Sequence, residues 1–274
     1  MKVAIQGIQG SFHQQVAHQY FDETIEVVEC KTFKDVAKQL AKNEVDFGIM
    51  AIENSIAGAL LPNYALIDTY QFNVVGEYYL KISLNVMALP GQKIEEIQEI
   101  HSHPIALLQC AKFLEKHKHI KIIESDDTAI AAKNIFENQT KGVAALAGPT
   151  AAVIFNLEIL APEVQSVESS ITRFMILEKE ITNYQSKKIN KASLKFQLDD
   201  TPGSLATVLN VLHNCKLNVT KIQSLPIIET PFHYSFFIDV VFDKYPHYEK
   251  AKKVMELMTK QFKVLGEYPL GNQI

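Results

Sequence analysis

The sequence has almost no arginine. It contains 27 lysine and arginine residues in total, and Arg173 is the single arginine among them. Arginine differs from lysine in having a planar guanidinium, which binds a carboxylate through two hydrogen bonds. Arg173 is therefore expected either to hold an anionic ligand or to form a structural ion pair that lysine would fill poorly. Its position in the sequence favours neither.

Further absences exclude several classes of protein. No apolar run approaches the roughly 20 residues of a membrane span, and the N-terminal run MKVAIQG is not the pattern of a signal peptide. With a net charge of −4 and no basic stripe, the chain is not expected to bind nucleic acid. Cys30, Cys110 and Cys215 are widely spaced, so we expect buried, reduced thiols in a cytoplasmic protein.

What is present indicates an α/β protein. Short apolar runs alternate with helical patterns from residue 2 to residue 178, which predicts a parallel sheet with helices on its faces. The extended run 72–90 is too long for one strand and is expected to lead into a second lobe. Lobe one would comprise about 1–75 and 165–180, and lobe two about 76–164, with a small ligand bound between them.

The last third of the chain has a different pattern. The polar segment 181–191 is expected to be a linker, with Lys187, Lys188 and Lys191 in solvent. Residues 192–270 then follow the order strand, helix, strand, strand, helix, strand. This βαββαβ order predicts a ferredoxin-like domain. Thr201 is the predicted cap of its first helix, followed by a proline at the first helical position.

Two segments place small polar residues at the ends of predicted strands. GIQGSF, residues 7–12, joins a strand to a helix, and Ser11 lies where free N–H groups favour an anion. A plain turn is the alternative there. Glu53, Asn54 and Ser55 follow a buried strand, at the end where α/β sheets bind ligands. The alternative is a turn formed by Asn54 and Ser55 beside a solvated Glu53.

A third segment, IHSHPIALLQC, places Ser102 before a helix predicted over 104–117. Gln109 lies two helical turns beyond Ser102, so both side chains can face the same side. Zinc binding by His101 and His103 is a rival interpretation, without a third ligand to support it. Four other histidines are expected to be ordinary surface or capping residues: His13, His18, His117 and His119.

Taken together, these segments resemble the prephenate dehydratase family. GIQGSF, AIENSIAG, SHPIALLQC, DDTAIAA, GVAALAG and SITRFMIL have the order and spacing of that family, and DDTPGSLATVLNVLHNCKLNVTKIQSLP is similar to its ACT regulatory domain. The resemblance implies a two-lobed, periplasmic-binding-protein-like catalytic domain, 1–180, followed by an ACT domain. It implies that prephenate loses carbon dioxide and its ring hydroxyl to give phenylpyruvate, in phenylalanine biosynthesis, with no metal or organic cofactor.

The resemblance also implies roles for individual residues. Thr172 would give a hydrogen bond or proton to the departing hydroxyl. The other catalytic positions are Glu53, Asn54, Ser102 and Gln109. Substrate binding is expected from Ser11, Ser55, Arg173 and Phe174. Because adjacent side chains of a strand point to opposite faces, we favour an ion pair through which Arg173 fixes Thr172 over direct contact with substrate.

The chain departs from the family pattern at several positions. His13 stands where a hydroxyl residue is usual, Ala51 where a proline is usual, and Ser170 where an asparagine is usual. In the phenylalanine site of the ACT domain, Gln223 and Leu225 replace a glutamate and an arginine. Control by phenylalanine is thus a hypothesis, and the residues that would form its site are Gly203, Ser204, Leu205, Gln223, Ser224, Leu225 and Pro226.

The partners implied by the resemblance are prephenate, phenylalanine and further copies of the chain, as a homodimer or homotetramer. Two alternatives remain open. An arogenate dehydratase would take the amine analogue of prephenate, and a non-catalytic sensor would close on a dianion without converting it.

Overall fold

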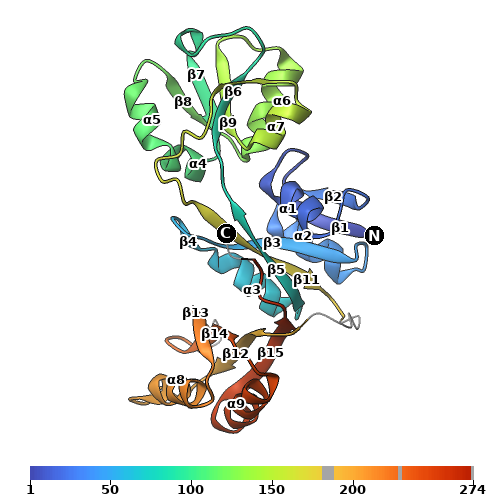
Figure 1. Ribbon diagram of the computed structural model, residues 1–274, viewed down its shortest axis with the longest axis vertical. Coiled ribbons are helices and arrows are strands. Elements are labelled where there is room, and N and C mark those ends of the chain that lie inside the picture. The colour runs from blue at the N-terminus through green and yellow to red at the C-terminus, as the bar shows by residue number, and fades with distance from the viewer. Residues whose placement is uncertain (181–187, 228–229, 273–274) are drawn as a thin grey trace. The chain divides into compact units, whose positions relative to one another are not determined.

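The computed structural model describes residues 1–180, 188–227 and 230–272, which form a mixed α/β protein (Figure 1). The chain divides into two compact units, one made of Met1–Leu66 with Tyr78–Phe174 and the other of Ile67–Glu77 with Met175–Gln273. Strands β5 (Asn73–Lys81) and β11 (Ile171–Glu178) each begin in one unit and end in the other. No helix in the described part of the chain is long and apolar enough to cross a membrane.

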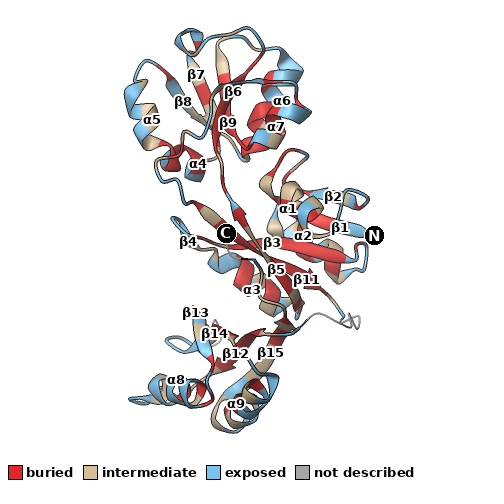
Figure 2. Cartoon of the chain, viewed as in Figure 1, coloured by how far each residue is buried: buried red, intermediate tan, exposed pale blue. Residues whose placement is uncertain are grey.

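The first sheet has the strand order β2-β1-β3-β11-β5, with β4 paired to the end of β3. β1 pairs in parallel with β2 and with β3, as the alternation of strands and helices predicted. β3 is buried over most of its length (Figure 2), which accounts for its continuous apolar sequence. The other elements of this region are β1 (Lys2–Gln6), α1 (Phe12–Tyr20), β2 (Glu26–Cys30), α2 (Phe33–Ala41), β3 (Phe47–Asn54), β4 (Gly58–Ala59) and α3 (Leu61–Thr69).

The second sheet has the order β10-β6-β9-β7-β8, in which β7 runs parallel to β8 and β9. The extended run 72–90 is divided between β5 and β6, as its length predicted. The helix predicted over 104–117 is instead two short helices that meet at Cys110. The elements are β6 (Asn85–Ala88), η1 (Ile94–Glu96), β7 (Glu99–Ser102), α4 (Pro104–Gln109), α5 (Ala111–Lys116), β8 (Lys121–Glu124), α6 (Thr128–Asn138), β9 (Val143–Ala147), α7 (Pro149–Ile154) and β10 (Glu158–Ala161).

The third sheet is antiparallel, with the order β13-β14-β12-β15. Residues of its strands form a core with buried residues of α8 and α9, including Val208, Leu212 and Tyr248. The βαββαβ order is as predicted. The elements are β12 (Lys191–Gln197), α8 (Ser204–Asn214), β13 (Asn218–Pro226), β14 (Tyr234–Val241), α9 (Tyr245–Met258) and β15 (Lys260–Tyr268).

Two local predictions for this region are wrong. Helix α8 begins at Ser204 with Gly203 at the cap position in the left-handed conformation (φ 85°), and the Thr201 carbonyl accepts the Ser204 N–H. Thr201 therefore belongs to a turn before the helix. The predicted linker lies mostly outside the described residues, and its last residue, Lys191, is buried at the start of β12. Lys188 is exposed, as predicted.

Candidate active site

The amide of Asn54, at the end of β3, organises a cluster of polar side chains. Its Oδ1 accepts the backbone N–H groups of Ile56 and Ala57, both at 2.9 Å, which closes a turn after the strand. Those two donors fix the orientation of the amide, because only the oxygen can accept them. Nδ2 therefore faces the other way, and it donates to the Thr172 hydroxyl at 2.9 Å and to Ser170 Oγ at 3.3 Å.

Thr172 lies at the start of β11 and is 9% exposed. Its Oγ1 accepts the Asn54 amide, so its own hydrogen remains available to donate to another group. An amide that holds the oxygen of a hydroxyl in this way aims a proton donor without adding charge. Thr172 and Asn54 are thus brought together, as predicted, although they lie 118 positions apart in the sequence.

Gln109 connects this cluster to the second sheet. It is the last residue of α4, and its Nε2 donates to Asn54 Oδ1 at 3.3 Å. Its backbone carbonyl accepts the Ser166 N–H at 2.7 Å, which anchors the end of the helix. The sequence predicted that Gln109 lies on this helix, and its role in the reaction stays a prediction.

Ser102 precedes that helix, as predicted. It ends strand β7, outside α4, and His103 is the residue that caps the helix. Its hydroxyl is completely buried and donates to the Leu146 carbonyl of β9 at 2.6 Å. The observed hydrogen bond ties β7 to β9, and the shared orientation of Ser102 and Gln109 stays a prediction.

Ser55 and Glu53 lie on either side of Asn54. Ser55 Oγ donates to the Ser169 carbonyl at 3.2 Å and accepts the Ile171 N–H at 3.0 Å, so this residue joins the turn after β3 to the start of β11. Glu53 pairs with Ala59 of β4 and is partly exposed. The predicted contacts of both side chains with substrate stay predictions.

Ser11 lies at the start of α1, as predicted, and its side chain caps the helix. Its buried Oγ accepts the Gln14 N–H at 3.3 Å. Gly7 (φ 101°) precedes it, and a Cβ added there would lie 3.4 Å from Asp127 Oδ2. The Asp127 carboxylate caps α6 by accepting the Ala129 and Ile130 N–H groups, and burial raises its pKa nonetheless. A helix N-terminus and a carboxyl group with a raised pKa therefore lie close together here.

Arg173 and Phe174 follow Thr172 on β11, and both are buried, at 4% and 1% exposure. The ring of Phe174 meets the edge of His13 at a centroid distance of 5.0 Å. The ion-pair role of Arg173 and the substrate contact of Phe174 stay predictions.

His13 was expected to be a surface or capping residue, and this prediction is wrong, because Ser11 caps the helix and His13 is buried. It is 8% exposed and lies between Phe33 and Phe174, and its Nε2 has no hydrogen-bond partner among the described residues. Burial lowers the pKa of its imidazole to about 3, so the ring is neutral. A histidine with aromatic residues on both sides could have been suspected only from the fold.

Ser170 also belongs to this cluster, and the sequence analysis noted it only as a departure from the family pattern. It is completely buried, its Oγ accepts the Asn54 amide, and its carbonyl accepts the Ile82 N–H at 2.7 Å. Its place two residues before Thr172, on the same face of the chain, was the available signal. No charged side chain takes part in the hydrogen bonds among Asn54, Ser170, Thr172 and Gln109.

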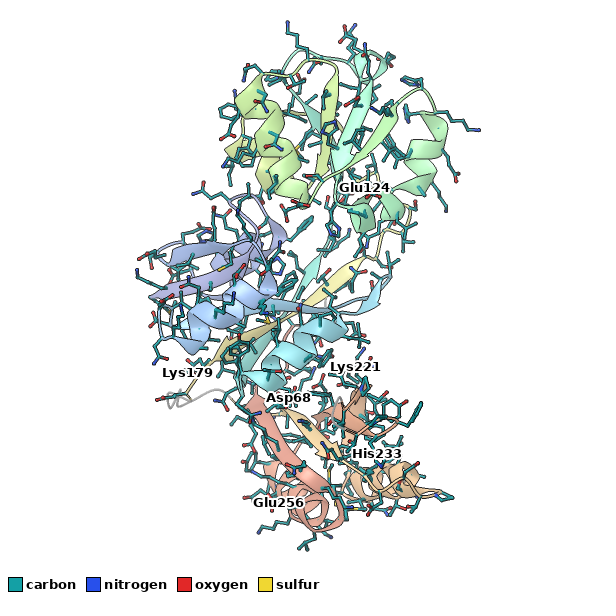
Figure 3. The ribbon with its side chains drawn as sticks, turned by 180° about the vertical axis from the view of Figure 1, so that it is seen from behind. Asp68, Glu124, Lys179, Lys221, His233 and Glu256 are labelled. Carbon is teal, nitrogen blue, oxygen red and sulfur yellow. The ribbon has the colours of Figure 1, made fainter. Side chains whose placement is uncertain are left out.

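The residues predicted for phenylalanine lie in the other compact unit. Gly203, Ser204 and Leu205 open helix α8, and the second motif, Gln223 to Pro226, ends strand β13, on which Figure 3 labels Lys221. Gln223 pairs with Phe237 of β14. Their function as an effector site stays a prediction. In the described ranges no group of three or more His, Cys, Asp or Glu side chains could hold a metal ion.

Comparison with known proteins places this cluster in context. The family described as prephenate dehydratase matches residues 3–182. The bifunctional chorismate mutase/prephenate dehydratase of Aquifex aeolicus (strain VF5) is 32% identical over 274 residues, which cover 98% of this chain and 74% of the relative. The arogenate dehydratase/prephenate dehydratase 2, chloroplastic, of Arabidopsis thaliana is 31% identical over 280 residues, which cover 98% of this chain and 73% of the relative.

Among solved structures, a prephenate dehydratase from Arthrobacter aurescens in complex with L-Phe superposes with a TM-score of 0.88. The match covers 98% of this chain and 89% of the other, at 22% identity. At that identity the likeness is one of fold.

Proposed function

Since the chain belongs to the prephenate dehydratase family, we propose that it converts prephenate to phenylpyruvate. The observation that carries the proposal is the 2.9 Å hydrogen bond from Asn54 to Thr172, which leaves the threonine proton free to donate. Prephenate is a dianion with a ring hydroxyl that must depart. In the reaction, the dianion and one proton give the phenylpyruvate anion, carbon dioxide and water.

Two bonds break in this reaction. The C–O bond of the ring hydroxyl breaks with its electron pair leaving on oxygen, while the bond to the ring carboxylate breaks and its electron pair completes the aromatic ring. The departing oxygen needs a proton or a strong hydrogen bond, which Thr172 is positioned to give. Asn54 fixes the Thr172 oxygen, and Gln109 supports Asn54 from α4.

Neutral groups suit this chemistry because the substrate itself carries two negative charges. Amides and hydroxyls stabilise a developing charge in a fixed geometry without repelling a dianion. Ser11 and the N–H groups at the start of α1 would hold one carboxylate, since a helix N-terminus favours an anion. Glu53, Ser55 and Ser102 remain proposed contributors on the motif match alone.

The domain assignment is part of the proposal. Residues 1–180 would be the catalytic domain, with a two-lobed periplasmic-binding-protein-like arrangement, and residues 192–270 an ACT regulatory domain. The βαββαβ order and the antiparallel sheet support the second assignment. A homodimer or homotetramer in the cytoplasm is the expected assembly.

Phenylalanine is the proposed effector of the C-terminal domain. The solved relative from Arthrobacter aurescens contains L-Phe, which supports this choice of ligand. Gln223 and Leu225 lack the charges that the family usually has there, so weaker inhibition than in charged relatives is expected. Titrating phenylalanine into the assay tests this, and a flat response would contradict it.

The decisive experiment follows phenylpyruvate formation from prephenate by the purified protein, with a chelator present. Turnover supports the proposal. Tight binding of prephenate without product would favour a dianion sensor instead. Arogenate is tested in parallel, because one of the relatives is named for both dehydratase activities, and a preference for arogenate would identify the alternative enzyme.

A further inference from the structure

One face of the C-terminal sheet is polar and nevertheless buried. In β12, Ala192, Leu194 and Phe196 lie in the core with α8 and α9. Alternation along the strand puts Lys191 and Ser193 on the opposite face, where they are only 1% and 2% exposed. Charged and polar side chains enclosed to this extent need partners.

The segment Ile67–Glu77 supplies the partner of Lys191 within the same compact unit. Ser193 instead hydrogen-bonds to Asp239 of β14 and to Tyr268 of β15. Lys191 Nζ donates to both carboxylate oxygens of Glu77, at 2.9 and 2.8 Å, and the two side chains are 1% and 0% exposed. The Gly271 N–H adds a third donor to Glu77 at 3.0 Å. The lysine and the carboxylate therefore compensate each other in a site without solvent.

Two further contacts fix the same segment. Lys195 donates to both carboxylate oxygens of Asp68, labelled in Figure 3, at 2.6 and 2.7 Å. A Cβ added to Gly266 of β15 would lie 1.9 Å from the Val74 carbonyl oxygen, so only glycine permits this approach. The Lys195–Asp68 pair is partly exposed, at 14% and 28%, unlike Lys191 and Glu77.

A buried ion pair is a poor choice if the contact has only to be stable. Removing two charges from water costs about as much as their attraction returns, and apolar residues of similar volume often hold a buried contact equally well. What the pair adds is a unique geometry. Glu77 lies in the middle of β5, in the sequence NVVGEYYLK, so the pair sets the position of that strand relative to β12.

Strand β5 leads from Glu77 to the catalytic cluster. Directly after its last residue, the Ile82 N–H donates to the Ser170 carbonyl at 2.7 Å. Ser170 Oγ accepts the Asn54 amide, which also holds Thr172. Glu77 is therefore connected to Ser170 through the second half of β5 and one hydrogen bond.

We propose that Lys191 is a positioning residue for the reaction. By fixing Glu77 it fixes β5, and through β5 it positions Ser170 and the Asn54–Thr172 pair. Its kinetic consequence rests on the proposed function, whereas its effect on β5 does not. The experiment therefore reads both turnover and local hydrogen exchange.

The test uses the full chain with Lys191→Met and with the double substitution Glu77→Met/Lys191→Met. The single variant removes the Lys191 ammonium from the buried Glu77 carboxylate and should lose much of its thermal stability. The double variant should recover the melting temperature but keep a kcat lower by about tenfold to a hundredfold, with KM unchanged. Amides of residues 78–82 and 170–172 should exchange faster than in the wild type.

A second uncharged double variant, Glu77→Gln/Lys191→Met, keeps an acceptor for the Gly271 N–H. It is used instead if Glu77→Met/Lys191→Met does not fold. The matched control is Lys195→Met/Asp68→Asn, which removes the neighbouring ion pair without touching β5 and should leave kcat and exchange at wild-type values. Recovery of both kcat and slow exchange in a stable neutral pair would overturn the proposal. If the wild type does not turn over prephenate, the proposed function fails, and the exchange measurements alone decide this inference.

Discussion

The Asn54 cluster and the Lys191–Glu77 pair are both buried and polar, yet they are built from opposite kinds of groups. The first consists of amides and hydroxyls, and Thr172 retains a proton that no neighbour in the cluster needs. The second consists of two full charges, in which Lys191 donates twice to Glu77 and the Gly271 N–H donates once. The first leaves a hydroxyl proton for a ligand, and the second joins two opposite charges.

This difference distinguishes a cluster that can bind a ligand from an ion pair that holds elements of the fold in place. A neutral cluster can receive a dianion because it brings no charge that the substrate must displace. A buried ion pair instead holds the elements that carry it in one geometry. The burial of polar side chains alone is therefore no sign of an active site. What matters is whether a buried group can still donate or accept a hydrogen bond with a ligand.

The largest effect is expected from a substitution of Thr172, the proton donor of the neutral cluster. Thr172→Val keeps the shape of the side chain and removes the hydroxyl, so kcat should fall by about three orders of magnitude while the melting temperature stays within a few degrees. Steady-state kinetics and thermal denaturation check both. Turnover within tenfold of the wild type would contradict the assigned role.

His13 offers a third kind of buried polar group, neutral and without a partner at Nε2. Its pKa is about 3 in the folded chain, against an unfolded value of about 6.5. Between these values the unfolded chain binds a proton that the folded chain excludes, so stability falls as the pH falls through this window. From pH 7 to pH 4, the free energy of unfolding should fall by about 3 kcal/mol more in the wild type than in His13→Phe, which has no histidine to protonate at this position. Urea denaturation at both values measures this, and equal losses would refute it.

Asn54→Ser sharpens the comparison by separating two roles of one amide. Serine retains an oxygen that can cap the turn at Ile56 and Ala57 but cannot reach Thr172. We expect kcat to fall about a hundredfold, because the proton donor is no longer aimed. The same assay decides, and a change in KM alone would show that the amide only binds substrate.

The smallest effect is expected at Gln109. Its 3.3 Å bond to Asn54 is long and joins neutral groups, so Gln109→Leu should cost about 1 kcal/mol, or five- to tenfold in kcat/KM. Gln109→Glu is the matched control. It keeps the length of the side chain but adds a negative charge beside the proposed dianion site, so it should be the more damaging change.

The sequence was sufficient where local pattern decides structure. Alternating apolar runs identified the strands, and Ser11 was recognised at its helix start because the cap pattern is local. Asn54 and Thr172 were assigned together only through a family resemblance, since nothing local reveals a contact between two strands so far apart in sequence.

The misses share a physical cause. Ser102 was placed before a helix, as observed, but its hydrogen bond to Leu146 of a neighbouring strand was not predicted. Lys191 was assigned to solvent from its lysine-rich surroundings, and its burial depends on Glu77, 114 positions away. His13 is enclosed by rings from two other elements. Local sequence patterns do not predict the environment of a side chain whose neighbours come from distant segments.

The most direct test of the account is a double-mutant cycle between Thr172→Val and Asn54→Ser, read as kcat for phenylpyruvate formation. If Asn54 acts through the Thr172 proton, the double variant should be no slower than Thr172→Val within about threefold, because the two residues work as a unit. Losses that multiply would contradict this account, since Asn54 would then act on the substrate independently of the hydroxyl.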